Sequence, residues 1–201
     1  MRPVTTRLAL LALMAVAAGC DKTVTAPSAP GAGAHKAILS SPVSVSVVTR
    51  NTALATAQSA SAVIGLLGGR LTLPGAGLTV VIPPFALTSP TRITVTAVAG
   101  NQLAYEFAPH GIRFLAPLVV TQSLLGTSAL SGGLLPKPLI AGYFASLSDL
   151  DPLAGTAQVS EILGTSVNLQ TGTVTFPVVH FSGYLVATGD DRDASTAGSN
   201  Q

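Results

Sequence analysis

The chain has 201 residues, of which 48% are hydrophobic, only 9% are charged and 4% are aromatic, enough for one domain of ordinary size with an aliphatic core. Its 20 glycines and 14 prolines interrupt it too often for long helices. The formal net charge is +2, and two of the ten basic residues, Arg2 and Arg7, lie in a segment that we expect to be removed, so nothing indicates the basic patch of a nucleic-acid-binding protein.

The N-terminal residues have the pattern of an export signal. Two arginines and no acid precede an uninterrupted apolar run over residues 8–18, which suits a signal-peptide core and is too short to span a bilayer. Gly19 and then Cys20, the only cysteine, follow this run. One thiol makes neither an internal disulfide nor a multi-cysteine metal site. The location of Cys20 directly after the apolar run therefore explains its presence better than redox chemistry does.

Residues 16–20, Val-Ala-Ala-Gly-Cys, resemble the lipobox of bacterial lipoproteins, although Ala17 stands where leucine is commonest. The resemblance implies cleavage between Gly19 and Cys20 and acylation of Cys20 with palmitate-type chains. Each buried CH₂ contributes about 0.8 kcal/mol, so several acyl chains would anchor the protein stably. We therefore expect a membrane-anchored envelope lipoprotein, at the outer membrane or the periplasmic face of the inner membrane. The alternative is an ordinary cleaved signal with an incidental cysteine.

The two ends of the mature chain have the composition of unstructured segments. Residues 20–42 are dominated by Ala, Pro, Gly, Ser and Thr, so we expect a flexible linker behind the acylated cysteine. Residues 189–201 are polar and predict a disordered tail. Its acids, Asp190, Asp191 and Asp193, lack the turn glycine and distal glutamate of a calcium loop, which favours a solvated tail.

Residues 43–188 show the pattern of a folded all-β domain. Valines at positions 43, 45 and 47 alternate with mostly polar neighbours, which is the period of a strand. Residues 49–61 are rich in Ala, Thr and Ser and are expected to form a loop. Short apolar runs separated by Gly, Pro and Asn then predict a series of strands. These runs span residues 62–66, 70–73, 78–82, 92–98, 102–107, 112–114, 118–123, 139–144, 158–162, 166–169, 173–178 and 183–187.

About a dozen short strands at this spacing predict an antiparallel β-sandwich in which two sheets enclose one apolar interior. No helical repeats alternate with the strands, so a parallel α/β sheet is disfavoured. The apolar run at residues 131–145 leaves a short helix as an alternative for that segment.

Several of these stretches together resemble the ZU5 domain. They are residues 68–74 (GGRLTLP), 77–87 (GLTVVIPPFAL), 91–96 (TRITVT), 105–118 (YEFAPHGIRFLAPL) and 176–184 (FPVVHFSGY). The resemblance covers about residues 63–187 and implies a β-sandwich that mediates protein contacts, with no catalytic residues to carry over. Phe85 and Ala108 stand where the family commonly has glycine, which leaves open whether the backbone keeps a positive φ there.

His180 and Ser182 are the nearest approach to a base and a nucleophile. Two residues apart on a strand, they would face the same side with Cα atoms about 7 Å apart, too far for a direct hydrogen bond. No carboxylate lies close in sequence, and no Gly-x-Ser-x-Gly motif occurs. We expect His180 to satisfy backbone groups at a strand end, and Phe181 and Tyr184 to pack or hydrogen-bond at a sandwich corner.

A metal site would require His110 to meet His180 and a third ligand such as Glu106. The preferred interpretation is that Glu106 forms an ion pair with Arg113 across a hairpin. Gly75 and Gly77 do not form a phosphate loop, because neither a Lys-Ser/Thr pair nor a helix follows.

Tyr105, Tyr143 and Phe144 could stack against a sugar, or could simply pack in the core and at its rim. The sequence thus predicts a lipid-anchored, non-enzymatic protein-interaction module with an unidentified protein partner. It predicts no catalytic residue, cofactor, metal or nucleic acid. The alternatives are a hydrolase or metal-dependent enzyme using His110 and His180, and a carbohydrate-binding module.

Overall fold

The computed structural model describes residues 36–130 and 138–189, all of which fall within one compact unit, Ala34–Gln201. The expected signal, the cleavage point at Gly19, the lipid site at Cys20 and the acids of residues 190–193 lie outside the described residues. The described chain consists of antiparallel strands and short 3-10 turns without an α-helix, so the all-β prediction is confirmed. Within these ranges, no helix has the length and apolar character needed to cross a membrane.

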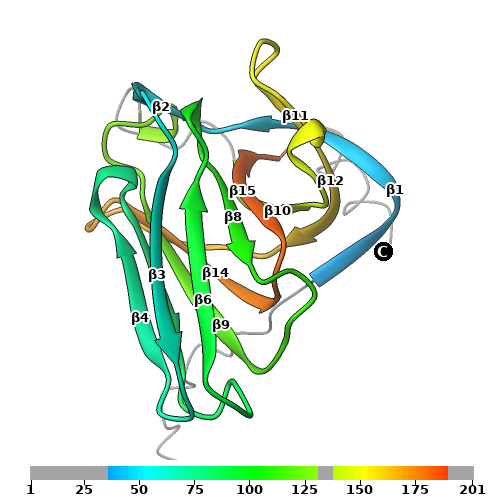
Figure 1. Cartoon of the computed structure of the whole chain (residues 1–201). Coiled ribbons are helices and arrows are strands. Elements are labelled where there is room, and N and C mark those ends of the chain that lie inside the picture. Colours follow the sequence, from blue (N-terminus) through cyan, green and yellow to red (C-terminus); the bar gives the residue numbers. More distant parts are fainter. Residues whose placement is uncertain (1–35, 131–137, 190–201) are drawn as a thin grey trace, which may run out of the picture. The chain divides into compact units, whose positions relative to one another are not determined.

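An eight-stranded antiparallel sheet forms one layer of the domain (Figure 1). Its hydrogen-bonded neighbours follow the order β1-β12-β10-β15-β8-β6-β3, and β11 pairs with β12. The strands are β1 (Lys36–Val47), β3 (Gln58–Ile64), β6 (Thr91–Ala97), β8 (Ala104–Ala108), β10 (Leu139–Phe144), β11 (Leu150–Asp151), β12 (Thr156–Leu163) and β15 (Gly183–Thr188).

A five-stranded antiparallel sheet with the order β13-β14-β9-β5-β4 forms the other layer, and a separate two-stranded sheet pairs β2 with β7. The five strands are β4 (Gly69–Leu73), β5 (Leu78–Ile82), β9 (Arg113–Ser123), β13 (Ser166–Asn168) and β14 (Thr173–His180). The small sheet contains β2 (Thr49–Leu54) and β7 (Gly100–Gln102). The 3-10 turns are η1 (Pro74–Ala76), η2 (Ser128–Leu130) and η3 (Leu147–Asp149).

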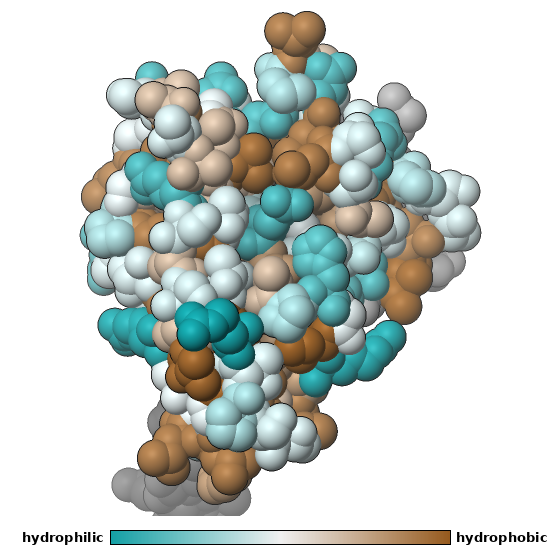
Figure 2. Space-filling view, viewed as in Figure 1, coloured by the Kyte–Doolittle hydropathy of each residue, from teal (hydrophilic) through white to brown (hydrophobic). Residues whose placement is uncertain are grey.

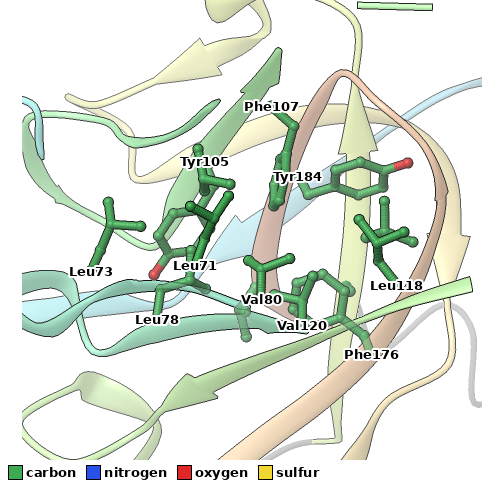
Figure 3. Close-up of a cluster of buried hydrophobic side chains, with 14 of the residues drawn as sticks. Leu71, Leu73, Leu78, Val80, Tyr105, Phe107, Leu118, Val120, Phe176 and Tyr184 are labelled. Carbon is green, nitrogen blue, oxygen red and sulfur yellow. The ribbon is translucent and has the colours of Figure 1, made fainter. Parts of the chain in front are cut away.

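The two large sheets bury their facing side chains in a shared core. Val80 and Val120 of the five-stranded sheet belong to the same buried cluster as Phe107 and Tyr184 of the eight-stranded sheet (Figure 3). Side chains of a strand alternate between its two faces, so each sheet contributes every second residue to this core. The β-sandwich prediction is confirmed for this part of the domain.

A second apolar core lies on the other side of β15. Strand β1 pairs with β12 and also with β15, through Ser46–Thr188 and Val47–Ala187. Because β12 pairs with β10 and β10 with β15, these four strands close a ring. The cluster on this side consists of Val45, Val47, Ala104, Phe144, Ala157, Val159, Leu185 and Ala187. The domain therefore has two apolar cores, not the single interior expected from the sequence.

Two segments that were expected to lie outside the strands contain strands. Strand β1 begins at Lys36, inside the linker expected over residues 20–42, and pairs with β12 from its first residue. Residues 49–61, expected as a loop, contain β2 and most of β3. In β3, small residues at the edge of the sheet are joined to β6 by side-chain hydrogen bonds, Ser59 to Thr96 at 2.8 Å and Ser61 to Thr94 at 3.0 Å. Backbone pairing supports both segments, and each adds a few partly buried apolar residues, Leu39 in β1 and Leu54 and Ala60 in β2 and β3.

The alternative of a helix within residues 131–145 does not apply to the described part of that segment, where β10 covers Leu139–Phe144. Residues 131–137 lie outside the description.

Candidate functional site

Two loops and the start of one strand, at one end of the sandwich, expose large apolar side chains. Leu66 and Leu67 lie in the turn between β3 and β4, Phe85 follows β5, and Leu115 lies near the start of β9. Their exposed fractions are 49%, 86%, 67% and 73%. We call these four residues the apolar loop surface. Figure 2 shows hydrophobic residues at the lower end of the domain, where the β3–β4 turn lies in Figure 1.

Backbone hydrogen bonds hold these segments side by side. The Phe85 N–H donates to the Leu66 carbonyl at 2.7 Å, and the Leu115 N–H donates to the Ala86 carbonyl at 3.0 Å. A cavity of about 310 Å³ adjoins them, with Leu87, Ile112 and Leu115 among its lining residues. Leu115 is thus shared between the exposed apolar group and a hollow whose other lining residues are partly polar, among them Thr88 and Arg113. Exposed apolar groups of this kind are typical of contact sites.

Phe85 combines two unfavourable features. Its φ of 63° lies in the left-handed region, which residues with a side chain seldom adopt, and its ring is two-thirds exposed. Neither backbone preference nor core burial accounts for phenylalanine here, and such strain is concentrated at functional positions in proteins. Of the two positions where the family commonly has glycine, Phe85 keeps a positive φ and Ala108 does not.

His180, at the end of β14, has partners at both ring nitrogens. Nε2 lies 3.2 Å from Oε2 of Glu161 on β12, and Nδ1 lies 3.2 Å from the Tyr184 hydroxyl. The Tyr184 hydroxyl donates to the His180 carbonyl at 2.7 Å, and the Tyr143 ring packs edge-on against the imidazole at 5.0 Å. The orienting carboxylate comes from another strand, so a search close in sequence could not find it.

Ser182 does not lie on a common strand face with His180. It falls in the turn between β14 and β15, where it is buried and its hydroxyl donates to the Phe144 carbonyl at 3.4 Å. Ser182 therefore does not point at the imidazole, and the expected pairing of these two residues as nucleophile and base is not formed. The expected packing of Phe181 is confirmed by its contacts with Phe107 at 5.3 Å and Phe114 at 4.6 Å between ring centroids.

Residues 60–123 match the family model of the ZU5 domain. The predicted ZU5 resemblance is thereby confirmed for this stretch, which runs from within β3 to the last residue of β9. ZU5 is a protein-interaction domain. No curated protein matches the chain. All four residues of the apolar loop surface lie inside the ZU5 match, whereas β10 to β15, which supply most of the second core, lie after it.

Within the ZU5 segment, the expected hairpin pair of Glu106 and Arg113 is wrong. Glu106 lies on β8, between β6 and β15 in the eight-stranded sheet, and Arg113 begins β9 in the other sheet. The connection between them, which holds the exposed His110, crosses from one sheet to the other instead of forming a hairpin. Among residues 36–130 and 138–189, no three His, Cys, Asp or Glu side chains gather as a metal site would require.

Tyr105, Tyr143 and Phe144 pack in the core and at its rim, and the alternative of an exposed sugar-stacking platform does not apply to them. Tyr105, in the ZU5 segment, and Phe144 are buried, and Tyr143 is half-buried against His180 and Tyr184. These rings belong to the two cores and the rim between them, so they present no flat exposed row to a sugar.

Proposed function

We propose that this chain is a lipid-anchored, non-enzymatic protein-interaction module of the cell envelope, and that the apolar loop surface contacts its protein partner. The main support for the proposal is that the exposed apolar residues lie within the ZU5-matching segment. The segment that matches a protein-interaction family contains Leu66, Leu67, Phe85 and Leu115, which lie together and exposed.

The energetics of this surface suit a protein contact. Burying one large apolar side chain contributes about 1.5–3 kcal/mol, and a few such residues supply most of the binding energy at typical interfaces. The hydrogen bonds from Phe85 to Leu66 and from Leu115 to Ala86 hold the loops in place before a partner arrives. Less conformational entropy is then lost on binding.

The lipobox-like residues ending at Cys20 support the anchor. Fifteen residues, 21–35, separate Cys20 from the first strand, which begins at Lys36. Fully extended, such a segment reaches about 50 Å. The domain would therefore act within that distance of the membrane to which Cys20 is attached, and its partner would be an envelope protein.

Site-specific photo-crosslinking in cells that express the full chain tests the contact surface. A photoreactive residue at Leu67 is expected to capture a defined protein, and the Phe85→Ser variant is expected to lose that adduct. Leu153, in the turn between β11 and β12, is the matched control because it is a fully exposed leucine outside the ZU5 match. Identical adducts from positions 67 and 153, or none from position 67, would contradict the proposal.

Membrane fractionation tests the anchor separately. The Cys20→Ala chain should move from the membrane fraction to the soluble fraction, because the thiol that accepts the lipid is gone. Unchanged fractionation would contradict the anchor and leave the contact surface unaffected.

A further inference from the structure

Arg50 on β2 is a buried cation whose partners in the described chain are neutral. Only 8% of the residue is exposed. Nη1 donates to the Gln102 carbonyl, and Nη2 donates to the Tyr105 hydroxyl at 3.1 Å. Nε is buried without a hydrogen-bond partner, and no carboxylate of residues 36–130 or 138–189 forms a salt bridge with Arg50.

The network behind Arg50 adds no negative charge. The Tyr105 hydroxyl donates to Oε1 of Gln122, and the Gln122 side-chain amide donates to the Ala76 carbonyl at 3.1 Å. Burial raises the pKa of Tyr105, an effect that the charge of Arg50 only partly opposes, so this hydroxyl stays protonated near neutral pH. A guanidinium removed from water is costly unless it is paired and hydrogen-bonded. The described protein atoms compensate Arg50 with neutral hydrogen-bond acceptors and with the Tyr105 ring, whose centroid lies 5.7 Å from Cζ, but with no anion.

Arg50 also lines a cavity of about 340 Å³. Its other lining residues include Asn51 and Thr52 on β2, Gly75 in η1, Ser123 at the end of β9 and Gly126 after it. Asn51 and Thr52 are exposed, so the cavity is open to solvent at this rim. Arg50 is the only cation among the lining residues, and the remainder are neutral.

We propose that this cavity binds a single carboxylate group, which pairs with the guanidinium of Arg50. One lining cation matches the single charge of a carboxylate, whereas a phosphate monoester carries nearly two charges at neutral pH. Two of the five guanidinium N–H groups bond to Gln102 and Tyr105, and the planar guanidinium is suited to pair through the others with a planar carboxylate. The cavity volume is close to the lower limit of ligand sites, which fits a small acid or the end of a peptide.

The carboxylate can come from a free small acid or from the C-terminus of a polypeptide, and the cavity chemistry is the same for both. This site goes beyond the proposed function. Its lining residues include none of the apolar loop surface, so either proposal can fail without the other.

Titration of the isotopically labelled full chain, followed by NMR, tests the site. Acetate and the peptide Ala-Ala-Ala with a free C-terminus are the probes, and Arg50 Nε–H and the Gly75 and Gly126 amides are the reporters. We expect saturable shifts of these signals with both probes and none with the C-terminally amidated peptide. Tighter binding of the free peptide assigns the carboxylate to a polypeptide terminus, and equal or tighter binding of acetate assigns it to a small acid.

Two variants separate binding from folding. Arg50→Met removes the charge, and Thr52→Trp obstructs the rim while keeping Arg50. Each is expected to weaken carboxylate binding at least about tenfold. Arg92→Met, at an exposed arginine on β6, is the matched control and should bind as the unmodified chain does. Absence of saturable shifts in the folded unmodified chain, shifts with sulfate alone, or unweakened binding by a folded Thr52→Trp chain would overturn the proposal.

Discussion

The Tyr184 hydroxyl donates a 2.7 Å hydrogen bond to the backbone carbonyl of His180. The two residues flank the turn that takes the chain from β14 in the five-stranded sheet to β15 in the eight-stranded sheet. A tyrosine that bonds back to the backbone a few residues upstream is a known stabilising feature of β-sandwich corners. We therefore expect this hydroxyl to matter for stability more than for any chemistry of His180.

The Tyr184→Phe substitution should lower the free energy of unfolding by about 1–2 kcal/mol, because the His180 carbonyl loses its donor while the ring still packs. Urea denaturation followed by circular dichroism measures this change. Tyr143→Phe is the control, since its ring also packs against His180 but no hydrogen bond of its hydroxyl joins it to the described chain. That control should stay within about 0.5 kcal/mol of the unmodified chain. Equal losses would show that the hydrogen bond is unimportant.

Alkaline pH should destabilise the fold. Burial raises the pKa of Tyr184 above its ordinary value of 10.0, and Glu161 and Tyr143 raise it further. In the unfolded chain this hydroxyl loses its proton near pH 10, while in the folded chain it stays protonated to higher pH. Its contribution to stability is therefore complete below about pH 10 and declines as the pH rises above that value. Urea midpoints across this range should fall more steeply for the unmodified chain than for Tyr184→Phe, and parallel curves would refute this assignment.

Gly183→Ala should destabilise the domain by about 1–3 kcal/mol through overpacking. A Cβ at this position would overlap the ring of Phe144, which is buried in the second core and cannot move aside freely. Thermal unfolding provides the measurement. Gly65→Ala is the matched control, because nothing lies within 4 Å of its added methyl group and its φ is not in the left-handed region. Similar unfolding temperatures for the two variants would argue against a tightly packed second core.

Phe85→Gly should separate stability from binding. Glycine adopts the φ of 63° without strain, so the free energy of unfolding should rise by up to about 1 kcal/mol. Crosslinking from position 67 should nevertheless weaken, because the exposed ring is lost. Phe85→Ala keeps a Cβ in the strained conformation and should lose the adduct without gaining stability. A Phe85→Gly chain that keeps the adduct would show that the ring takes no part in the contact.

Much of the sandwich could be predicted because its central strands expose one apolar face to the core. Residues 78–82 and 93–97 alternate between buried and half-buried positions, as their hydropathy indicates. The start of β1 and the first part of β3, before the predicted strand at residues 62–66, could not be found in this way. Their residues are mostly small and exposed, and backbone pairing with β12 and β6 maintains them.

The side-chain clusters were harder to predict than the strands. Glu161, Tyr143 and Tyr184 lie in register on β12, β10 and β15, and the turn from β14 to β15 brings His180 beside them. Arg50 on β2 bonds to Tyr105 on β8, which in turn bonds to Gln122 on β9. Whether side chains on different strands come into contact depends on strand order and register in the sheet, which local sequence patterns do not encode. The unusual backbone of Phe85 could have been predicted from the sequence, because Phe85 replaces a glycine common in the family and keeps a left-handed conformation.

The ring of β1, β12, β10 and β15 affects the order in which the domain can assemble. Strand β1 pairs with β15, although more than 130 residues separate Val47 from Thr188. A nascent chain releases β1 from the ribosome well before β15, so Val45 and Val47 have no complete core to enter until β15 has been synthesised. The domain thus reaches its final hydrogen-bonded state only after translation has passed β15, and a prematurely terminated chain leaves the edges of β1 and β10 unpaired and prone to aggregation.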